Sequence, residues 1–332
     1  MKLFIAPVII SVIALLAVWM WGGWAAFLLA CLLSVLEVTL SFDNAVVNAK
    51  VLAQMSEKWQ RRFLTWGILL AVFGTRLVLP AIIVSIAALV SPITAAILAF
   101  ENPEEYGRLL SGATPLIGAF GGAFLLMVSL KYFFDVGKRV HWISVIETRL
   151  ARWGRIEAIE LALALSTLLI LSYLAHAPQG PVLAAGCIGI LLFIVIQGVA
   201  SSLRVDNGHV VQTVTQTGAI LFIYLNILDA AFSLDGVIGA FALTTVIPII
   251  FVGLGIGAYF VRSITVYLVR KKTLEALKYL EHGAHWAILG LALAMLAGLV
   301  VHIPEAVVGL IGLVFVSLAY YSSRRALKKG IL

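Results

Sequence analysis

Long apolar runs dominate the chain, with short polar segments between them. Ten runs have about the 20 residues that a membrane-spanning helix needs. A transmembrane β-barrel would instead show segments of roughly 10 residues with alternating polarity, a pattern this chain lacks. The pattern predicts an all-α polytopic membrane protein. Its ten predicted helices cover residues 3–22, 24–49, 64–90, 112–134, 157–175, 181–203, 213–242, 246–269, 284–302 and 304–322.

Two segments test the limits of this assignment. Ser91 to Phe100 is apolar but too short to span a membrane alone, so it is expected to form a half-helix or an extension. Met1 to Trp21 has one lysine and a long apolar stretch. A cleaved signal peptide would have a shorter apolar core and a small-residue cleavage site, so a first spanning helix is expected here.

Composition excludes a soluble domain. The 332 residues are 62% hydrophobic and 12% charged, with a mean hydropathy of +1.10, whereas soluble domains are about 25% charged. A single transmembrane domain over residues 1–332 is therefore expected. Cys31 and Cys187 each lie in an apolar run without a CxxC motif or a nearby histidine pair. They are expected to be small buried side chains, not a disulfide or a metal site.

The net charge of +7 comes from basic residues concentrated in every second loop and in the C-terminal tail. This distribution follows the positive-inside rule, so it predicts membrane topology and no nucleic-acid partner. Both termini are expected in the cytoplasm, with the protein in the cytoplasmic (inner) membrane. The loop and tail residues are Lys50, Lys58, Arg61, Arg62, Lys138, Arg139, Arg149, Arg152, Arg155, Arg270, Lys271, Lys272, Lys278, Arg324, Arg325, Lys328 and Lys329.

A polar motif interrupts the second predicted helix and returns in the seventh. LEVTLSFDNAVVNA, Leu36 to Ala49, can be aligned with LDAAFSLDGVIGAF, Leu228 to Phe241. Ionisable groups inside a membrane are costly and mark functional sites by default. The alignment pairs Glu37 with Asp229, Ser41 with Ser233, Asp43 with Asp235, and Asn44 with Gly236.

The helices that follow each motif also correspond. Gly67 precedes Arg76 by nine residues, as Gly253 precedes Arg262, and the next helices open on LLSGA and LEHGA. Three consecutive matches predict repeats at about 24–134 and 213–302, with peripheral helices at 1–22, 157–203 and 304–322. The matched helices are five spans apart and so cross in opposite directions. Such inverted repeats build many secondary transporters; a duplicated scaffold that keeps its charges only for packing is the alternative.

Helical spacing divides the motif residues into two groups. Glu37, Ser41, Asn44 and Asn48 form one stripe on a helix, and Asp229 with Ser233 forms the same stripe in the second half. Asp43 and Asp235 lie about 120° away. Either these aspartates face another helix, or the helix unwinds near each motif. Gly236 would ease such a break.

Together the motifs offer carboxylate, hydroxyl and amide oxygens, with no histidine or cysteine in either. Hard divalent cations such as Mg²⁺, Ca²⁺ and Mn²⁺ prefer these ligands. Four carboxylates would overcharge one divalent ion, so protons, Arg76 and Arg262 are expected to balance the charge. The candidate cation-binding residues are Glu37, Ser41, Asp43, Asn44, Asp229, Ser233 and Asp235.

Other polar residues give weaker signals. Glu281, His282 and His285 open the ninth predicted helix, where a metal site is conceivable but solvated histidines at a helix entrance are expected. The sequence has no phosphate-binding glycine loop, no GxSxG and no HExxH motif, so no enzyme activity and no cofactor are expected.

The paired motifs, the Gly…Arg helices and YLEHGAHWAI at Tyr279 to Ile288 resemble the TerC family of integral membrane proteins. That family belongs to a wider group of LysE-type transporters with two inverted three-helix repeats. It is associated with tellurium resistance and, in several members, with efflux of manganese or other divalent cations. Carried over, the resemblance implicates Glu37, Asp43, Asn44, Asp229 and Asp235. No cystathionine-synthase-like domain follows the repeats, and the peripheral helices lie outside the shared core.

The sequence thus predicts a proton-coupled secondary transporter that exports a divalent cation, with Mn²⁺ first among the candidates and Ca²⁺ or Mg²⁺ as alternatives. Its expected partners are the ion, the lipid bilayer and either a second copy or another membrane protein. Two alternatives stay open: a non-transporting membrane scaffold that holds a structural ion, and an exporter of an organic cation or amino acid. The small number of aromatic residues near the motifs disfavours the exporter of an organic cation or amino acid.

Overall fold

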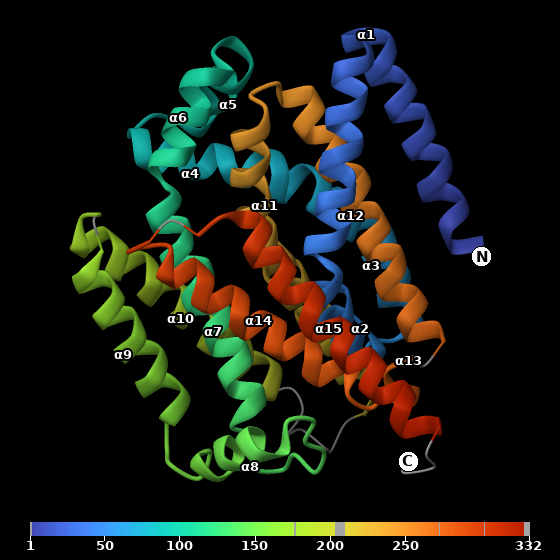
Figure 1. The fold of residues 1–332 in the computed structure, drawn as a ribbon, viewed down its shortest axis with the longest axis vertical. Coiled ribbons are helices and arrows are strands. Elements are labelled where there is room, and N and C mark those ends of the chain that lie inside the picture. Colours follow the sequence, from blue (N-terminus) through green and yellow to red (C-terminus); the bar gives the residue numbers. More distant parts are fainter. Residues whose placement is uncertain (1, 176, 203–209, 272, 302, 329–332) are drawn as a thin grey trace.

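The computed structural model describes residues 2–175, 177–202, 210–271, 273–301 and 303–328. These residues form helices and no strand (Figure 1). The elements are α1 Lys2–Leu40, α2 Phe42–Ala53, α3 Glu57–Leu69, the π-helix η1 Leu70–Val78, α4 Leu79–Ala88, α5 Pro92–Glu101, α6 Pro103–Gly112, α7 Thr114–Phe133, α8 Ser144–Trp153, α9 Ile159–Leu174, α10 Gln179–Ser202, α11 Val210–Leu243, α12 Ile247–Arg270, α13 Thr273–Ala276, α14 Leu280–Ala297 and α15 Glu305–Lys328.

Helix α1 contains two arms that meet at Gly23. The backbone there has φ 71° and ψ −165°, a conformation that glycine adopts readily because it lacks a Cβ. Figure 1 shows the chain rising from the N-terminus, reversing at the top and descending in the second arm. The reversal falls between the predicted helices 3–22 and 24–49, so the sequence located this boundary.

The second predicted helix breaks at Ser41. This residue has backbone angles of φ −98° and ψ 14°, which separate α1 from α2. The third predicted helix is continuous from α3 through η1 to α4, and it ends at Leu89 in a left-handed conformation. Ser91 to Phe100, expected as a half-helix or an extension, lies in the separate short helix α5.

Seven helices among the described residues are long and apolar enough to cross a membrane. The membrane class is therefore supported, whereas the predicted count of ten is not confirmed. Both arms of α1 fall within one candidate span, and α9 has 16 residues, fewer than a typical span. The seven segments are Leu3–Leu40, Glu57–Ile86, Thr114–Phe133, Gln179–Val199, Gly218–Phe241, Ile247–Arg270 and Leu280–Ala297.

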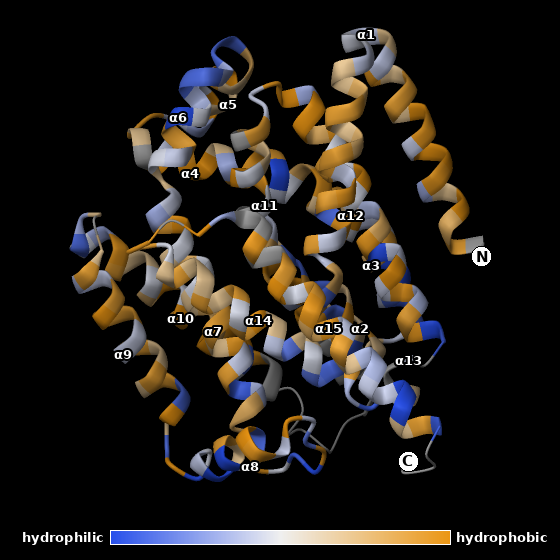
Figure 2. Cartoon of the chain, viewed as in Figure 1, coloured by the Kyte–Doolittle hydropathy of each residue, from blue (hydrophilic) through white to orange (hydrophobic). Residues whose placement is uncertain are grey.

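The outer faces of these helices are strongly apolar. Figure 2 shows hydrophobic residues along the first arm of α1, before Gly23, while hydrophilic residues gather around α8 and around the α5–α6 end. In this first arm of α1, Met20 is 84% exposed and Ile13 is 62% exposed. Apolar side chains that remain exposed over whole helices match a lipid environment and would be unfavourable in water.

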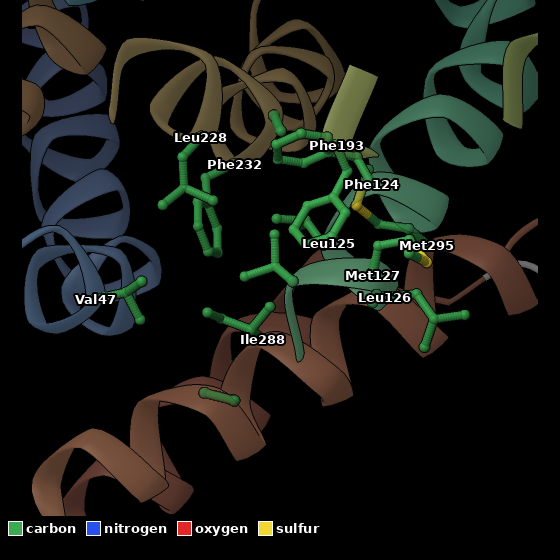
Figure 3. Packing of buried hydrophobic residues seen from close by; sticks show 14 of the residues in the cluster. Val47, Phe124, Leu125, Leu126, Met127, Phe193, Leu228, Phe232, Ile288 and Met295 are labelled. Carbon is green, nitrogen blue, oxygen red and sulfur yellow. The ribbon is translucent and has the colours of Figure 1, made fainter. Parts of the chain in front are cut away.

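The core is built around α7, which packs against α10, α11 and α14. Phe124 on α7 is fully buried and lies near Phe193 of α10, with ring centroids 6.0 Å apart. Figure 3 shows Leu228 and Phe232 of α11, Ile288 of α14 and Val47 of α2 around the same centre. This packing fixes α2, α11 and α14 relative to one another.

Close backbone approach makes the α7–α10 contact sensitive to side-chain size. A Cβ on Gly189 would lie 2.3 Å from the Phe120 carbonyl oxygen, whereas a Cβ on Gly198 of the same helix would meet no atom of the described residues within 4 Å. We expect Gly189→Ala to destabilise the protein by about 1–3 kcal/mol through overpacking. The matched control Gly198→Ala should be neutral or stabilising. Thermal unfolding in detergent tests both; equal effects would contradict this packing.

Candidate functional site

Five of the seven predicted cation-binding residues lie around one small buried cavity. The volume of this cavity is about 10 Å³, close to the space of one water molecule. The end of α1, the start of α2, η1, α11 and α12 all contribute to its wall. The lining residues are Glu37, Ser41, Asn44, Arg76, Asp229, Ser233, Ala258 and Val261.

The first half of the site is an ion pair between Glu37 and Arg76. Both side chains are nearly inaccessible, at 4% and 3% exposure, and the guanidinium Nη2 donates to Glu37 Oε1. The Ser41 hydroxyl donates to the same carboxylate oxygen over 3.3 Å. Because Ser41 stands at the helix break, its hydroxyl reaches back one turn to the carboxylate.

Arg76 is positioned by the π-helix η1. Its Nη1 donates to the carbonyl of Ala71 within the same π-helix and to the Thr75 hydroxyl over 3.2 Å. The Thr75 hydroxyl donates to the Ala71 carbonyl over 2.6 Å, and its oxygen lies 3.4 Å from the Ser233 hydroxyl on α11. Short π-helical segments inside α-helices are frequent at functional sites. Here the segment aims a buried guanidinium at α1.

The second half is an ion pair between Asp229 of α11 and Arg262 of α12. Arg262 Nη2 donates to Asp229 Oδ2 over 2.6 Å, and Asn44 Nδ2 donates to Asp229 Oδ1 over 2.7 Å. Arg262 also reaches the Asn226 amide oxygen at 3.3 Å and lies over the Phe63 ring at 4.2 Å. Asn44 thus joins the first motif directly to the acid of the second.

Two glycines leave the space that the buried Glu37 and Arg262 side chains occupy. A Cβ on Gly257 would lie 2.4 Å from the Cγ of Glu37, and a Cβ on Gly67 would lie 2.5 Å from Nη1 of Arg262. Gly67 belongs to the Gly…Arg pattern of the first predicted repeat, yet it makes room for the arginine of the second. A larger residue at either position would occupy the space of a charged group.

Asp43 and Asp235 differ from the other five residues. A Cβ on Gly312 of α15 would lie 3.5 Å from Asp43 Oδ2, with Ala287 of α14 on the same side. Asp43 therefore faces α14 and α15 and does not line the cavity. Of the two options considered from the sequence, a helix break is present and Asp43 still faces a different neighbour. The side chain of Asp235 lies outside the described residues.

The cavity is electrically balanced within the described residues. Two carboxylates meet two guanidiniums, and the remaining polar groups are hydroxyls and an amide. Asn44 Oδ1 and both polar atoms of Asn48 are buried without a hydrogen-bond partner in the part of the chain that the structure describes. No group of three or more His, Cys, Asp or Glu side chains that could hold a metal occurs among the described residues. The balanced arrangement uses arginines as the counter-ions of the acids.

A second buried polar cluster, centred on Glu147 of α8, was missed from the sequence. The carboxylate accepts hydrogen bonds from the backbone of Trp142 at 3.2 Å, from the Trp286 indole at 3.0 Å and from the His282 ring at 2.8 Å. Lys138 Nζ lies 3.1 Å away. Glu147 lies in a loop whose basic residues were assigned to membrane topology, and only its buried contact with α14 distinguishes it.

The expectation of solvated histidines at the start of α14 was wrong. His282 is 3% exposed and His285 is 6% exposed. The His285 ring stacks on Tyr132 with centroids 3.6 Å apart. The histidines therefore dock the end of α7 and helix α8 onto α14.

The Asp229–Arg262 pair can be tested through stability. Arg262→Met should destabilise the protein by about 3–5 kcal/mol because it leaves a buried carboxylate without its cation. Adding Asp229→Asn should recover much of that loss, since no buried charge remains. Thermal unfolding in detergent measures both, with exposed Arg152→Met as the control. A double variant no more stable than Arg262→Met would contradict the pairing.

The Glu147 cluster predicts a pH effect. Burial alone would raise the pKa of this carboxyl, but the hydrogen bond and charge of His282, the Trp286 hydrogen bond and Lys138 lower it to about 2 from 4.5. A lowered folded-state pKa contributes stability above the unfolded value, and this is lost as the pH falls from 4.5 towards 2. Glu147→Gln should lower the stability at neutral pH. It should also reduce the loss of stability between pH 4.5 and pH 2, as measured by thermal unfolding. If the variant loses as much stability between pH 4.5 and pH 2 as the wild type does, this assignment is contradicted.

Comparison with known proteins places the chain in a sequence family. The model of the family described as "Protein of unknown function (DUF475)" matches residues 42–329, which is most of the chain. The matched region contains Asp43, Arg76, Asp229 and Arg262, whereas Glu37 precedes it. No curated protein and no solved structure matches the chain. The resemblance to the TerC family remains a prediction. The chain belongs to the DUF475 family.

Proposed function

We propose that this protein is a secondary transporter that exports a divalent metal cation, with Mn²⁺ as the leading candidate, in exchange for protons. The proposal rests on one observation above all. Two buried acid–arginine pairs, Glu37 with Arg76 and Asp229 with Arg262, occupy positions that the sequence alignment matches between the two predicted repeats, and both acids line one cavity. A packing role alone would not require four buried charges at matching positions.

The inverted repeat belongs to this proposal. Each acid pairs with the arginine that follows it in its own repeat, and Asn44 links the two halves through Asp229. In transporters of this type, substrate binds between the repeats near the middle of the membrane, often beside a broken helix. The helix break at Ser41 lies beside the cavity, in agreement with such a site.

Cation binding would exchange one kind of positive charge for another. A divalent ion would take the place of a guanidinium beside Glu37 or Asp229, with Ser41, Ser233 and the Asn44 amide oxygen completing an all-oxygen site. Asn44 Oδ1, which accepts no hydrogen bond from any residue that the structure describes, is available for this role. Oxygen ligands suit Mn²⁺, Mg²⁺ and Ca²⁺, whereas Zn²⁺ sites usually recruit imidazole or thiolate.

Arg76 also lies at the boundary of a second cavity, of about 60 Å³. Tyr106 of α6 and Phe241 of α11 line this space, and their ring centroids are 5.5 Å apart. The first turn of α6 contains Glu104 and Glu105, in the connection between predicted helices three and four that the charge pattern assigns to the outer side of the membrane. The route from the cation site to the outside would therefore pass Arg76 and this aromatic pair.

Ion flux in proteoliposomes tests the proposal. Wild-type protein should carry Mn²⁺ across the membrane when a pH gradient is applied, and Glu37→Gln and Asp229→Asn should each lower the rate at least tenfold. Exposed Glu104→Gln on α6 is the matched control and should retain wild-type flux. Parallel measurements with Ca²⁺, Mg²⁺ and Zn²⁺ would define selectivity.

The same experiment separates the competing functions. A scaffold with a structural ion would bind Mn²⁺ saturably without any flux, and an organic-cation exporter would move no metal. Either outcome in a folded wild-type preparation would overturn the proposal.

A further inference from the structure

Helix α8 has an exposed side on which apolar and basic residues are mixed. Val145 is 68% exposed, Ile146 is 45% exposed and Trp153 is 54% exposed, and Arg149 and Arg152 are exposed among them. At about 100° per residue, these five positions fall within an arc of about 120° on the helix. Figure 2 shows hydrophobic and hydrophilic residues mixed along α8. We call these five residues the outer face of α8.

The opposite side of α8 is fixed to the rest of the protein. Glu147, which points the other way on the helix, bonds to His282 and Trp286 of α14. A Cβ on Gly154, directly after the helix, would lie 1.8 Å from the carbonyl oxygen of Phe134 at the end of α7. These two contacts, one near each end of the helix, hold α8 in one orientation. The outer face is therefore turned away from the protein.

The place of α8 in the fold brings this face to the edge of the membrane. Figure 1 shows α8 running across the lower end of the bundle, between the ends of α7 and α9. Helix α7 is a candidate membrane span, and α9 is a shorter apolar helix. Arg155 and Ile156, in the link from α8 to α9, are exposed and extend the outer face. A helix held in this way lies at the level of the lipid headgroups, where interfacial helices bind.

The arginines of this region have no acidic partner among the described residues. On α6, exposed Arg108 pairs with Glu105 three residues before it. No carboxylate in the described part of the chain lies within ion-pair distance of Arg149, Arg152 or Arg155. The acid that α8 contains is turned towards α14. The guanidinium groups are therefore available to an anion from outside the chain.

The mixture of charge and apolarity selects the class of partner. A nucleic acid or a free phosphate ion would pair with the arginines but would leave Val145, Ile146 and Trp153 in water. An anionic phospholipid provides both environments. Its phosphate accepts paired hydrogen bonds from a guanidinium, and the boundary of its acyl chains receives apolar side chains, tryptophan in particular. The long arginine side chains reach from this boundary back to the phosphates.

We propose that the outer face of α8, continued by Arg155 and Ile156, is a binding site for anionic phospholipid. The apolar side chains enter the boundary of the acyl region, and the arginines bind the phosphates around them. This site is separate from the cation cavity and does not depend on the proposed function. Because Glu147 joins α8 to α14, and α14 packs against α2 and α7, bound lipid should also stabilise the helices around the cavity.

Tryptophan fluorescence in vesicles tests the site in the full-length protein. Lipids with brominated acyl chains quench tryptophans that lie beside the acyl region. The difference between wild-type protein and Trp153→Phe isolates the emission of Trp153. Brominated phosphatidylglycerol, which is anionic, should quench this emission in preference to brominated phosphatidylcholine, with a relative affinity of at least about tenfold. High salt should weaken the preference because it screens the arginines.

Two charge variants show whether the arginines of α8 cause the preference. Replacing the three arginines of α8 and its link by glutamine should lower the relative affinity at least about fivefold. Replacing three exposed basic residues of α15 in the same way is the matched control and should leave it unchanged. If the α8 variant does not fold, Arg152→Gln alone should lower the relative affinity by a smaller factor. The substitutions are Arg149→Gln, Arg152→Gln and Arg155→Gln on the α8 side, and Arg324→Gln, Arg325→Gln and Lys328→Gln on α15.

The other outcomes refute the site. Equal quenching of Trp153 by the two lipids, or a preference that the α8 variant retains, would show that the arginines do not bind lipid phosphate. If neither lipid quenches Trp153, the outer face lies in water and suits an acidic protein or a nucleic acid instead. If inorganic phosphate abolishes the preference, the arginines bind a free anion. None of these measurements requires ion transport, so failure of the proposed function would leave the lipid site standing.

Discussion

Four charges buried in one small space constrain the rest of this molecule. Glu37, Asp229, Arg76 and Arg262 could not stay ionised in the interior singly, because removing one ion from water costs several kcal/mol. Each acid therefore needs its arginine at hydrogen-bonding distance. The helix break at Ser41, the π-helix η1 and the close approach of α12 at Gly257 all serve this requirement.

The hydropathy pattern and the motifs carried most of the information about this arrangement. Length and apolarity predicted an all-helical membrane protein, and the reversal at Gly23 fell where two predicted helices meet. The count of spans was harder to predict. Segments such as α9 are apolar enough for a membrane but also pack against α7 and α10, and apolarity alone does not separate lipid contact from protein contact.

Sequence spacing grouped the site correctly where helical periodicity applied. Glu37, Ser41 and Asn44 share a stripe, and they do line one cavity. Spacing also placed Asp43 off this stripe, but it did not reveal which neighbour the side chain would meet. That depends on the distant helices α14 and α15. Glu147 and His282, 135 residues apart, lay beyond any local pattern for the same reason.

The π-helix around Arg76 has a consequence for movement. A π turn holds more residues than an α turn, so conversion of this nine-residue segment to α-helix would rotate α4 about its axis relative to α3. This change would move Arg76 relative to Glu37. The segment Leu70–Val78 would therefore control the position of the one guanidinium that lines both cavities.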